Sequence, residues 1–393
     1  MRIERLWLTD FRNYAAADLE LAPGLTVVLG RNGQGKSNLL EAVSYLATLG
    51  SFRGAPTDAL IRAGADRAII RAEGEREGRR LLIEVELARN GRHRVQLNRQ
   101  RLRRNADLLG AFHCTVFAPD DLALLKEGPA VRRRYLDDAL VALDPRREAD
   151  QRELDRVLRQ RNALLRQVGG RLDEAAALTL DVWDDKLATV GERVAGARHE
   201  LVTELSPEVS LAYEQLAGRR HDLALRYERS WPAEPGLAAA LAASRRDDVR
   251  RGVSTVGPHR DELAIELSGL VARACASQGE QRTLALALKL AAHRLVAAAL
   301  GSPPLLLLDD VFSELDPQRC AALLAHLPAG QAMLTSADRM PTGSEPEHVY
   351  DVSDGRVTVR ADSPLPHADG PISRAEGQSS QPAESLDHGA QTW

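Results

Sequence analysis

Residues 30–37 read GRNGQGKS and fit the phosphate-binding pattern GxxxxGK[ST]. The apolar run LTVVLG precedes them and the helical pattern SNLLEAVSYLATLG follows, so the stretch is predicted to join a strand to a helix. In that setting glycine amides and the helix N-terminus approach the phosphates of ATP, Lys36 reaches the β and γ phosphates, and Ser37 is placed to ligate Mg²⁺. A chance glycine turn is the competing interpretation. The nucleotide-binding residues predicted here are Gly30, Arg31, Asn32, Gly33, Gln34, Gly35, Lys36, Ser37 and Asn38.

Two carboxylates follow the apolar run Leu305–Leu308, a pattern that indicates a fully buried strand. Asp309 ends this run, where a Walker B carboxylate would hold Mg²⁺ beside the phosphate loop. Asp310 comes next, where a general base or a water-orienting carboxylate is expected. Taken alone, LLLLDD could equally be a core strand reaching solvent. The phosphate loop in the same chain favours a catalytic set of Lys36, Asp309 and Asp310, with Ser37 and Asp309 as metal ligands.

A further candidate, SQGEQRTLALALKLAAHRL, starts at Ser277. Its serine and the glutamate three residues later, Glu280, form the pattern of a helix capping box, which is a sufficient structural explanation. Gly279 serves no capping purpose and costs a helix about 1 kcal/mol relative to alanine. We therefore expect another group to approach the backbone closely at Gly279.

The composition bounds the class of protein that could carry these residues. The chain has 393 residues, is 44% hydrophobic and 27% charged, and has a formal charge of -4, which suits a globular protein of more than one domain. No apolar stretch approaches the roughly 20 residues that cross a bilayer, and MRIERLWLTD lacks the apolar run of a signal peptide, so we expect a cytoplasmic protein without a membrane partner. Cys114, Cys275 and Cys320 lack metal or disulfide spacing and are predicted to be core thiols.

Arginines crowd three stretches, residues 92–104, 132–134 and 152–166. Local basic patches, rather than net charge, determine where a polyanion binds. A solvated arginine-rich surface explains the same stretches equally well, so charge alone leaves nucleic-acid binding open.

The hydrophobic pattern indicates the elements that position the candidate residues. The segments RIERLWLTDFRNY, AIIRAEGE, LLIEVELA and HRVQLN alternate as strands do, with Asn90-Gly91 predicted to form a tight type I′ turn and Gly50 predicted to end the first helix. Trp183, Leu187, Val190, Val194, Ala197 and Leu201 have coiled-coil spacing, and a second stripe runs from Leu154 to Val168. We expect an antiparallel helical pair that turns near Gly169-Gly170; an ordinary helical bundle remains the alternative.

Strand signals return in VSTVGPHRDELAIELSG and again near AMLTSA. From about residue 363 the chain is rich in Ser, Pro, Gly and Gln, a composition that does not fold alone. The predicted division is an N-terminal half of the head (1–119), a helical arm (120–250), a C-terminal half of the head (251–362) and a disordered tail (363–393).

The order of phosphate loop, SQGEQ, LLLLDD and the stretch Ser313 to Asp316 resembles the ABC-type ATPases, with their signature motif and D-loop. The resemblance implies an α/β fold, an ABC-type P-loop ATPase head with a mixed sheet, split by a short antiparallel coiled-coil arm. It also implies an ATP-dependent homodimer, in which Ser277, Gln278 and Gly279 act in trans on the nucleotide of the other head.

Further stretches narrow the resemblance to the RecF family of bacterial recombination mediators: FRNY (11–14), SFRGAPTDALIRAG (51–64), FAPDDLALLKEGPAVRRRYLD (117–137) and GPHRDEL (257–263). The family implies an SMC-like, DNA-binding ATPase that recognises double-stranded, gapped or junction DNA and, with RecO and RecR, helps to place RecA, supporting replication, repair and the SOS response. In this comparison the arm would clamp DNA, with arginines of its first helices facing the phosphates.

The chain departs from the wider class at several positions. Glutamate usually follows the Walker B aspartate, whereas Asp310 is one methylene shorter, which predicts slow, DNA-stimulated hydrolysis. Leu334-Thr335-Ser336 stands where a switch histidine is usual, and Thr335 is the candidate γ-phosphate sensor. Arg12 is predicted to approach a nucleotide phosphate, as in similar SMC-type heads, or else to stabilise its turn. For His259, Arg260 and Asp261, a structural turn and a DNA contact both remain open.

Two other functions compete with this interpretation. The nucleotide-binding subunit of a transporter would need a membrane partner, and the arginine-rich arm argues against it. A small-molecule kinase has a phosphate loop but no use for SQGEQ.

Overall fold

The computed structural model describes residues 1–337 and 340–360, which fall within one compact unit, Met1–Ser363. The predicted tail, 363–393, lies outside the described residues. The strands are β1 (Arg2–Phe11), β2 (Tyr14–Glu20), β3 (Leu25–Leu29), β4 (Arg67–Arg76), β5 (Arg79–Ala88), β6 (Arg94–Leu97), β7 (Gln100–Arg101), β8 (Cys114–Phe117), β9 (Leu223–Glu228), β10 (Glu262–Leu267), β11 (Leu270–Val271), β12 (Leu305–Asp309), β13 (Ala332–Ser336), β14 (His348–Ser353) and β15 (Arg356–Val359). The α-helices are α1 (Lys36–Thr48), α2 (Ala123–Lys126), α3 (Pro129–Leu143), α4 (Arg147–Val168), α5 (Glu174–Ala217), α6 (Leu237–Arg251), α7 (Ala272–Cys275), α8 (Gln278–Leu300) and α9 (Pro317–His326). Short 3₁₀ turns are η1 (Thr57–Leu60), η2 (Asn105–Leu108), η3 (Pro119–Leu122) and η4 (Val311–Glu314).

A mixed six-stranded sheet lies at the centre of the fold, in the order β15-β14-β3-β13-β12-β8. Its neighbours are parallel except for the antiparallel pair β14 and β15. Both faces of the sheet are covered: Leu305 and Leu307 of β12 belong to one apolar cluster, and Leu306 and Leu308 belong to another. The uninterrupted run of leucines is therefore the pattern of a strand buried on both sides, as predicted.

An antiparallel sheet, β2-β1-β4-β5-β6-β7, and helix α1 cover one face of the central sheet. The apolar residues of its strands alternate with charged ones because only one face is buried, as in β4, where Ala68, Ile70 and Ala72 are buried. The hairpin predicted at Asn90-Gly91 exists, but the prediction of a tight type I′ turn is wrong. A loop of five residues, 89–93, joins β5 to β6, only Gly91 of the pair has a positive φ (125°), and the His93 ring accepts a hydrogen bond from the Ala88 amide (3.2 Å).

Gly50 was predicted to end helix α1, but the helix ends one residue earlier than this prediction. Leu49, not Gly50, is the C-terminal cap, in a left-handed conformation (φ 55°) with its amide donating to the Tyr45 carbonyl. A second sequence prediction also needs correction: Cys275 is exposed, whereas Cys114 and Cys320 are partly buried, so only two of the three free thiols lie in or near the core.

Helices α8, α5, α3 and α9 cover the opposite face of the central sheet. The expectation that no apolar stretch approaches the length of a membrane span is wrong for helix α8, whose 23 residues are long and apolar enough to cross one; 56% of its apolar window is buried inside the fold. Its residues Leu284, Ala287, Leu288 and Ala291 are fully buried against neighbouring elements. A core helix between a sheet and other helices accounts for this composition without a bilayer.

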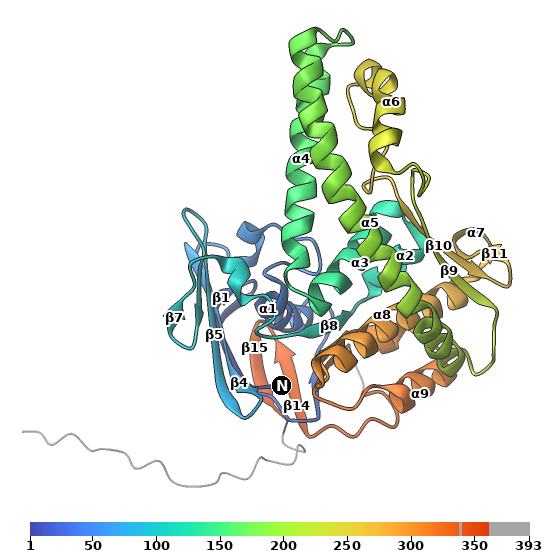
Figure 1. Cartoon of the computed structure of the whole chain (residues 1–393). Coiled ribbons are helices and arrows are strands. Elements are labelled where there is room, and N and C mark those ends of the chain that lie inside the picture. Colours follow the sequence, from blue (N-terminus) through green and yellow to red (C-terminus); the bar gives the residue numbers. More distant parts are fainter. Residues whose placement is uncertain (338–339, 361–393) are drawn as a thin grey trace, which may run out of the picture. The chain divides into compact units, whose positions relative to one another are not determined.

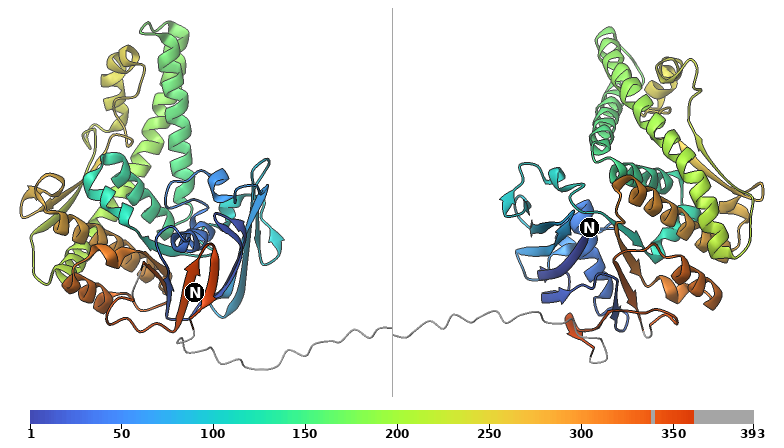
Figure 2. Two further views of the ribbon diagram at one scale, coloured as in Figure 1. Left: turned by 180° about the vertical axis from the view of Figure 1, so that it is seen from behind. Right: turned by 60° about the horizontal axis from the view of Figure 1, so that its bottom comes forward.

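Helices α4 and α5 form the predicted antiparallel pair and rise from the sheets with α6 beside them (Figure 1). Helix α4 ends at Gly169, a left-handed cap (φ 55°), and the predicted seam residues Leu187, Val190 and Val194 are buried. Helix α5 continues from the arm into the head (Figure 2). Its residues Tyr213 and Leu216, beyond Pro207, pack in the same apolar cluster as α8. Because α5 is shared in this way, the domain boundaries near residues 119 and 250 stay predictions.

Candidate nucleotide site

The phosphate-loop motif lies between β3 and α1, as the sequence predicts. Residues 31–33 at its tip are exposed, whereas Lys36 is buried and donates to the carbonyls of Gly30 (2.6 Å) and Arg31 (3.1 Å). The ammonium group therefore lies beneath the loop, and the free amides of the first turn of α1 point toward the same space.

Two glycines of the loop are required by close contacts. Gly30 has φ 153°, and a Cβ atom there would lie 2.3 Å from the Val352 carbonyl oxygen of β14. Gly35 has φ 118°, and a Cβ atom there would lie 2.5 Å from the Asn13 side chain. Neither the backbone conformation nor the space tolerates another residue type.

The two halves of the motif set meet at Ser37 and Asp309, which are 272 positions apart in the chain. The Ser37 hydroxyl donates to Asp309 Oδ1 at 2.7 Å, and the Thr335 hydroxyl donates to the same oxygen at 2.8 Å. The Thr335 oxygen also accepts from the Asp310 amide (3.0 Å). Thr335 is fully buried and thus braces the pair of aspartates; its role as a γ-phosphate sensor stays a prediction.

Asp310 follows β12 in a left-handed conformation (φ 48°), which is uncommon outside glycine. The chain turns sharply at this residue into the η4 turn, and the Ser313 hydroxyl donates to the Asp310 carbonyl (2.7 Å). Asp309 is thus the last residue of β12 and accepts from Ser37, while Asp310 is the first residue of the turn that follows the strand.

Sequence reasoning missed the residues that hold the loop from outside. The Asn13 side chain donates to the Gln34 carbonyl (2.8 Å) and accepts from Asn38 (2.8 Å), and the Tyr14 hydroxyl donates to the Gly35 carbonyl (3.0 Å). From the other end of the chain, the Asp354 amide donates to Gln34 Oε1 (2.6 Å). The sequence FRNY is distinctive, but nothing in it reveals that its turn contacts the phosphate loop some 20 residues further along the chain.

The Arg12 side chain contacts helix α1 and the η1 turn. It forms a two-pronged ion pair with the fully buried Glu41 of α1 (both contacts 2.7 Å) and donates to the Ala59 carbonyl (3.0 Å). The Ser51 hydroxyl also donates to Glu41. This arrangement matches the structural alternative, in which the arginine stabilises its turn, so a phosphate contact by Arg12 stays a prediction.

Ser277 caps α8 with the predicted capping box. Its hydroxyl accepts from the Glu280 amide (3.3 Å), and its own amide donates to Glu280 Oε2 (2.9 Å). Hydrogen bonds from the Ser277 amide and hydroxyl lower the pKa of the Glu280 carboxyl. Ser277 and Gln278 are exposed, so this turn presents its free amides to the exterior of the head.

The phosphate loop and the Ser277 turn lie on helices that cover opposite faces of the central sheet. Helix α1 packs in the cluster that contains Leu305 and Leu307, and α8 packs in the cluster that contains Leu306 and Leu308. The structure therefore brings together Lys36, Ser37, Asp309 and Asp310, but not the turn that contains Ser277, Gln278 and Gly279.

The GPHRDEL stretch joins the arm to the head. The Asp261 carboxylate is buried, accepts from the Ser230 amide (2.8 Å) and contacts the Tyr227 hydroxyl. The Pro258 carbonyl accepts from Arg198 of α5 (2.8 Å), and the Asp261 carbonyl accepts from Arg133 of α3 (2.7 Å). These contacts favour the structural turn over the DNA contact for this stretch.

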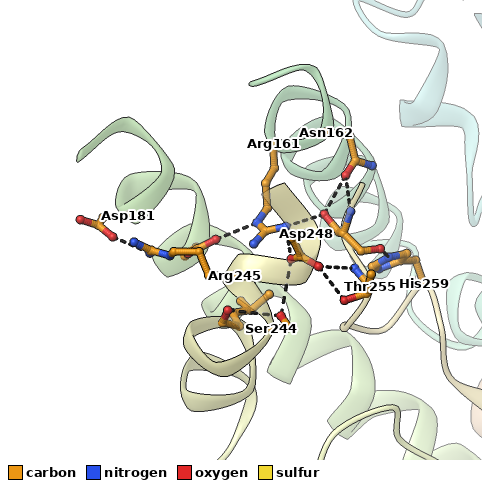
Figure 3. A network of polar contacts seen from close by, with 11 residues as sticks. Arg161, Asn162, Asp181, Ser244, Arg245, Asp248, Thr255 and His259 are labelled. Atoms are coloured by element: carbon orange, nitrogen blue, oxygen red, sulfur yellow. Dashed lines mark hydrogen bonds and ion pairs between the residues drawn. The ribbon is translucent and has the colours of Figure 1, made fainter. Parts of the chain in front are cut away.

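A buried polar network extends from this stretch into the arm (Figure 3). Arg161 of α4 is fully buried and pairs with Asp184 of α5 (2.7 Å) and Asp248 of α6 (2.8 Å). Arg161 also donates to the Ser254 hydroxyl (2.8 Å). The carbonyl of Ser254 in turn accepts a hydrogen bond from the His259 ring (3.0 Å). Burial lowers the pKa of His259 to about 4, so this ring is neutral near pH 7.

The predicted arginine clusters divide between structural and exposed positions. Arg132 is buried in a two-pronged pair with Glu262 (2.7 and 2.8 Å), and Arg161 is buried as described. By contrast, a groove of about 660 Å³ runs between η2 and the base of α4 and contains several arginines. It is lined by Arg104, Asp107, Pro145, Arg146, Glu148, Ala149, Arg152, Glu153 and Arg156.

This architecture, a phosphate loop and a Walker B carboxylate on neighbouring parts of one mixed sheet, with a helical arm inserted between them, defines an ABC-type ATPase head of the SMC kind. A family model described as the RecF/RecN/SMC N terminal domain matches residues 2–346. The chain is 44% identical over 374 residues to a DNA replication and repair protein RecF from Streptomyces avermitilis, a match that covers 91% of this chain and 99% of the relative. It is 41% identical over 378 residues to the RecF of Kineococcus radiotolerans, covering 88% and 96% of the two chains. The chain belongs to the RecF family.

Solved structures give the same result. A structure described as the recombination mediator protein RecF-ATPrS in the RecFOR pathway has a TM-score of 0.85 and 30% identity, covering 92% of this chain and 98% of that one. The corresponding RecF-ATP structure has a TM-score of 0.84. An Smc head domain from Pyrococcus furiosus, with an extended coiled coil and the C-terminal domain of ScpA, has a TM-score of 0.54 at 19% identity and shares the fold.

Proposed function

We propose that this chain is an ATP-switched DNA-binding protein of recombinational repair. It binds ATP and Mg²⁺, forms a homodimer when ATP is bound, and clamps double-stranded, gapped or junction DNA. The observation that carries the proposal is the 2.7 Å hydrogen bond between Ser37 and Asp309, because it joins the candidate phosphate loop to the candidate Walker B carboxylate. The curated relatives are described as DNA replication and repair proteins, and two similar solved structures as RecF with ATP or ATPrS.

The residues present fit a magnesium nucleotide. Ser37 Oγ and Asp309 Oδ1 are hard oxygen donors 2.7 Å apart, the ligand type that Mg²⁺ prefers when it shares its shell with phosphates and water. When bound, the ion neutralises negative charge on the β and γ phosphates. Lys36 adds a second cation beside these phosphates, and Thr335 holds Asp309 in place from behind.

Dimerisation is supported by the separation of the two motif sets. The turn of Ser277, Gln278 and Gly279 is exposed and lies on a helix across the sheet from the phosphate loop, so it suits a nucleotide held by another copy. The free amides at the N-terminus of α8 favour a phosphate oxygen at this position.

Hydrolysis is proposed to be weak and stimulated by DNA. Asp310 leaves β12 through a left-handed turn and is one methylene shorter than glutamate. A base that fails to reach its water loses proton-transfer assistance worth typically 10²- to 10⁴-fold. If this geometry limits the rate, Asp310→Glu raises turnover; an unchanged rate would contradict the explanation.

DNA binding is proposed for the groove between η2 and α4. Arg152, Arg156 and Arg159 of α4 are exposed and follow one another at helical spacing, so they lie along one side of the helix. Among the described residues, no ion pair is recorded for Arg156 or Arg159. Exposed guanidinium groups without fixed partners are free to neutralise phosphates.

The wider role follows from the family and is proposed in the same sense. The protein acts in the cytoplasm with RecR and RecO to help load RecA on gapped DNA, supporting replication and the SOS response.

The decisive experiment measures the solution mass of Asp310→Asn by light scattering, with and without Mg-ATP. Lys36→Met is the control that cannot bind the phosphates. Conversion of monomer to dimer by ATP, only with Lys36 intact, supports the proposal. A mass that never changes removes the trans role of Ser277 to Gly279. A stable ATP-loaded monomer that phosphorylates a small molecule would instead support a kinase.

A further inference from the structure

Two arginines connect the Ser277 turn to the stretch Ser313–Asp316 within one head. Arg282 of α8 donates to the Glu314 carbonyl (3.2 Å) and pairs with the Glu314 carboxylate (3.3 Å). Arg319 of α9 makes a second connection: its guanidinium pairs with Asp316, at the end of this stretch, and lies next to Gly279 in the Ser277 turn. The two segments are thus joined twice, although 32 or more residues separate them in sequence.

Arg319 is held on one side by Asp316. The Asp316 carboxylate caps α9 by accepting from the Arg319 amide (2.9 Å) and also pairs with the Arg319 guanidinium. The bond from the Arg319 amide, with help from its guanidinium, lowers the pKa of the Asp316 carboxyl. Asp316 is therefore ionised near pH 7 and keeps the arginine in place.

The Arg319 guanidinium also lies close to Gly279. A Cβ atom at Gly279 would be 3.2 Å from Nη1, 3.4 Å from Nη2 and 3.5 Å from Cζ of Arg319. The two terminal nitrogens are the nearest atoms and the central carbon is only slightly farther, so the end of the guanidinium group covers the glycine. This contact supplies the close approach expected at Gly279, and it comes from the same chain.

The position of this cation is electrostatically unusual. Gly279 lies in the first turn of α8, where the helix macrodipole is positive and a cation is disfavoured. Asp316 and Glu280 offset part of this repulsion, and an anion arriving at the turn would offset the rest. A side chain needed only to fill space there would not require a charge.

We propose that Arg319 is a positioning residue for the Ser277 turn: it covers Gly279, joins the turn to the Asp316 stretch, and holds the turn ready for the phosphate of a second head. The inference rests on the proposed ATP-dependent dimer. Gly279 is small, in this account, because Arg319 occupies the adjacent space.

The test is a double-mutant cycle in the Asp310→Asn background, with Gly279→Ala, Arg319→Ala and the two combined. The dimer dissociation constant in Mg-ATP is measured by light scattering over a range of protein concentrations. We expect Arg319→Ala to raise it on the order of tenfold, and Gly279→Ala to raise it because its Cβ displaces the guanidinium. Gly279→Ala should add almost nothing once Arg319 is removed.

A purely structural role is separated by two further readouts. The affinity of the monomer for ATP and the melting temperature should not change, because the phosphate loop lies across the sheet. Arg319→Lys, which keeps the charge but not the planar group, should be intermediate. The matched control is Arg250→Ala, an arginine that pairs with an aspartate three residues earlier (2.6 Å) on α6 and should dimerise like the parent.

The outcomes are distinct. If the parent dimerises and Arg319→Ala dimerises equally well, the inference is wrong and the proposed function stands. If Gly279→Ala weakens the dimer by the same factor with and without Arg319, the glycine serves the incoming nucleotide and the inference is again wrong. If the parent stays monomeric with ATP, the proposed dimer and the inference fail together.

Discussion

The arginines of the arm occupy two different environments, buried and exposed, although the sequence presents them as one cluster. Arg161 is fully buried between Asp184 and Asp248, whereas Arg156 and Arg159, on the same helix, face solvent. The helical period explains the difference. Val157, Leu158, Arg161 and Leu165 are the buried residues that follow Leu154 in α4, so Arg161 occupies an apolar stripe. A count of arginines in a sequence window therefore overstates the cations available to DNA.

The buried arginine joins the three helices of the arm. Three helices, α4, α5 and α6, are joined through one guanidinium group, and Asp248 accepts further bonds from the Thr255 amide (2.9 Å) and hydroxyl (2.6 Å). A network of buried charges is costly to break, because each partner left behind is desolvated and unpaired. The buried set should thus control stability and the exposed set should control binding.

Arg161→Ala tests the buried set and should have the largest effect. Removing the guanidinium leaves Asp248 buried without its cation and Asp184 with Arg245 alone (2.6 Å); breaking a buried pair in this way typically costs about 3–5 kcal/mol of folding free energy. Urea unfolding measures the loss. Arg159→Ala is the matched control on the same helix and should stay within about 0.5 kcal/mol of the parent. Equal stability of the two variants would remove the distinction between the sets.

The pH dependence of stability tests the neutral state of His259, next to the same network. Burial lowers the pKa of His259 to about 4, and the nearby cations Arg260, Arg133 and Arg161 act in the same direction. The unfolded ring, with a pKa near 6.5, binds a proton that the folded ring rejects, so stability present above about pH 6.5 is lost as the pH falls toward 4.

His259→Gln isolates this contribution. His113 and His293 also have a pKa of about 4 because of burial, so the variant should keep part of the acid sensitivity. Between pH 4 and 6.5 its unfolding free energy should fall with a slope shallower by up to about 1.4 kcal/mol per pH unit, the effect of one proton. An identical slope in both proteins would mean that His259 titrates normally.

Two glycines of α5 give a smaller test of the junction. A Cβ atom at Gly191 would lie 2.4 Å from Leu237 Cδ2 and 3.2 Å from Pro258, whereas none of the described atoms lies within 4 Å of one at Gly196. Gly191→Ala should destabilise by about 1–3 kcal/mol through overpacking, less the gain of about 1 kcal/mol in helix propensity. Gly196→Ala should show the gain alone. Thermal unfolding of the pair measures the difference, and equal shifts would show that α6 is not packed against Gly191.

Much of the head was predictable because its signals are local. Each of these signals depends on residues within a few positions of one another: the phosphate loop, the buried strand before Asp309, the capping box at Ser277, and, in the arm, the end of helix α4 at Gly169. The contacts that complete the site are not local. Asn13 and Asp354 reach the loop from the turns that follow β1 and β14, and Thr335 reaches Asp309 from β13; no periodicity reveals which strands will be neighbours.

The same limit explains the errors. Asn90-Gly91 has the composition of a tight turn, but His93 and a bond from the Arg89 amide to the Asp66 carbonyl (2.9 Å) widen the loop to five residues. At Gly279 the sequence predicts a close approach but not its partner, which is Arg319, 40 positions later. In both cases a tertiary contact decides between interpretations that the local sequence allows.

Arg156→Ala and Arg159→Ala test the exposed set and should have the smallest effect on stability. Both side chains are solvent-exposed, so unfolding should stay within about 0.5 kcal/mol of the parent. If each neutralises one phosphate of duplex DNA, each variant should reduce the slope of log affinity against log salt by about 0.9, and weaken binding similarly for all sequences. Arg250→Ala, exposed on α6 and already paired with Asp247, is the control that should leave the slope unchanged. A slope that none of the three variants alters would place the DNA away from α4, while a slope altered by Arg161→Ala but not by Arg156→Ala would show that arm geometry, rather than local charge, governs binding.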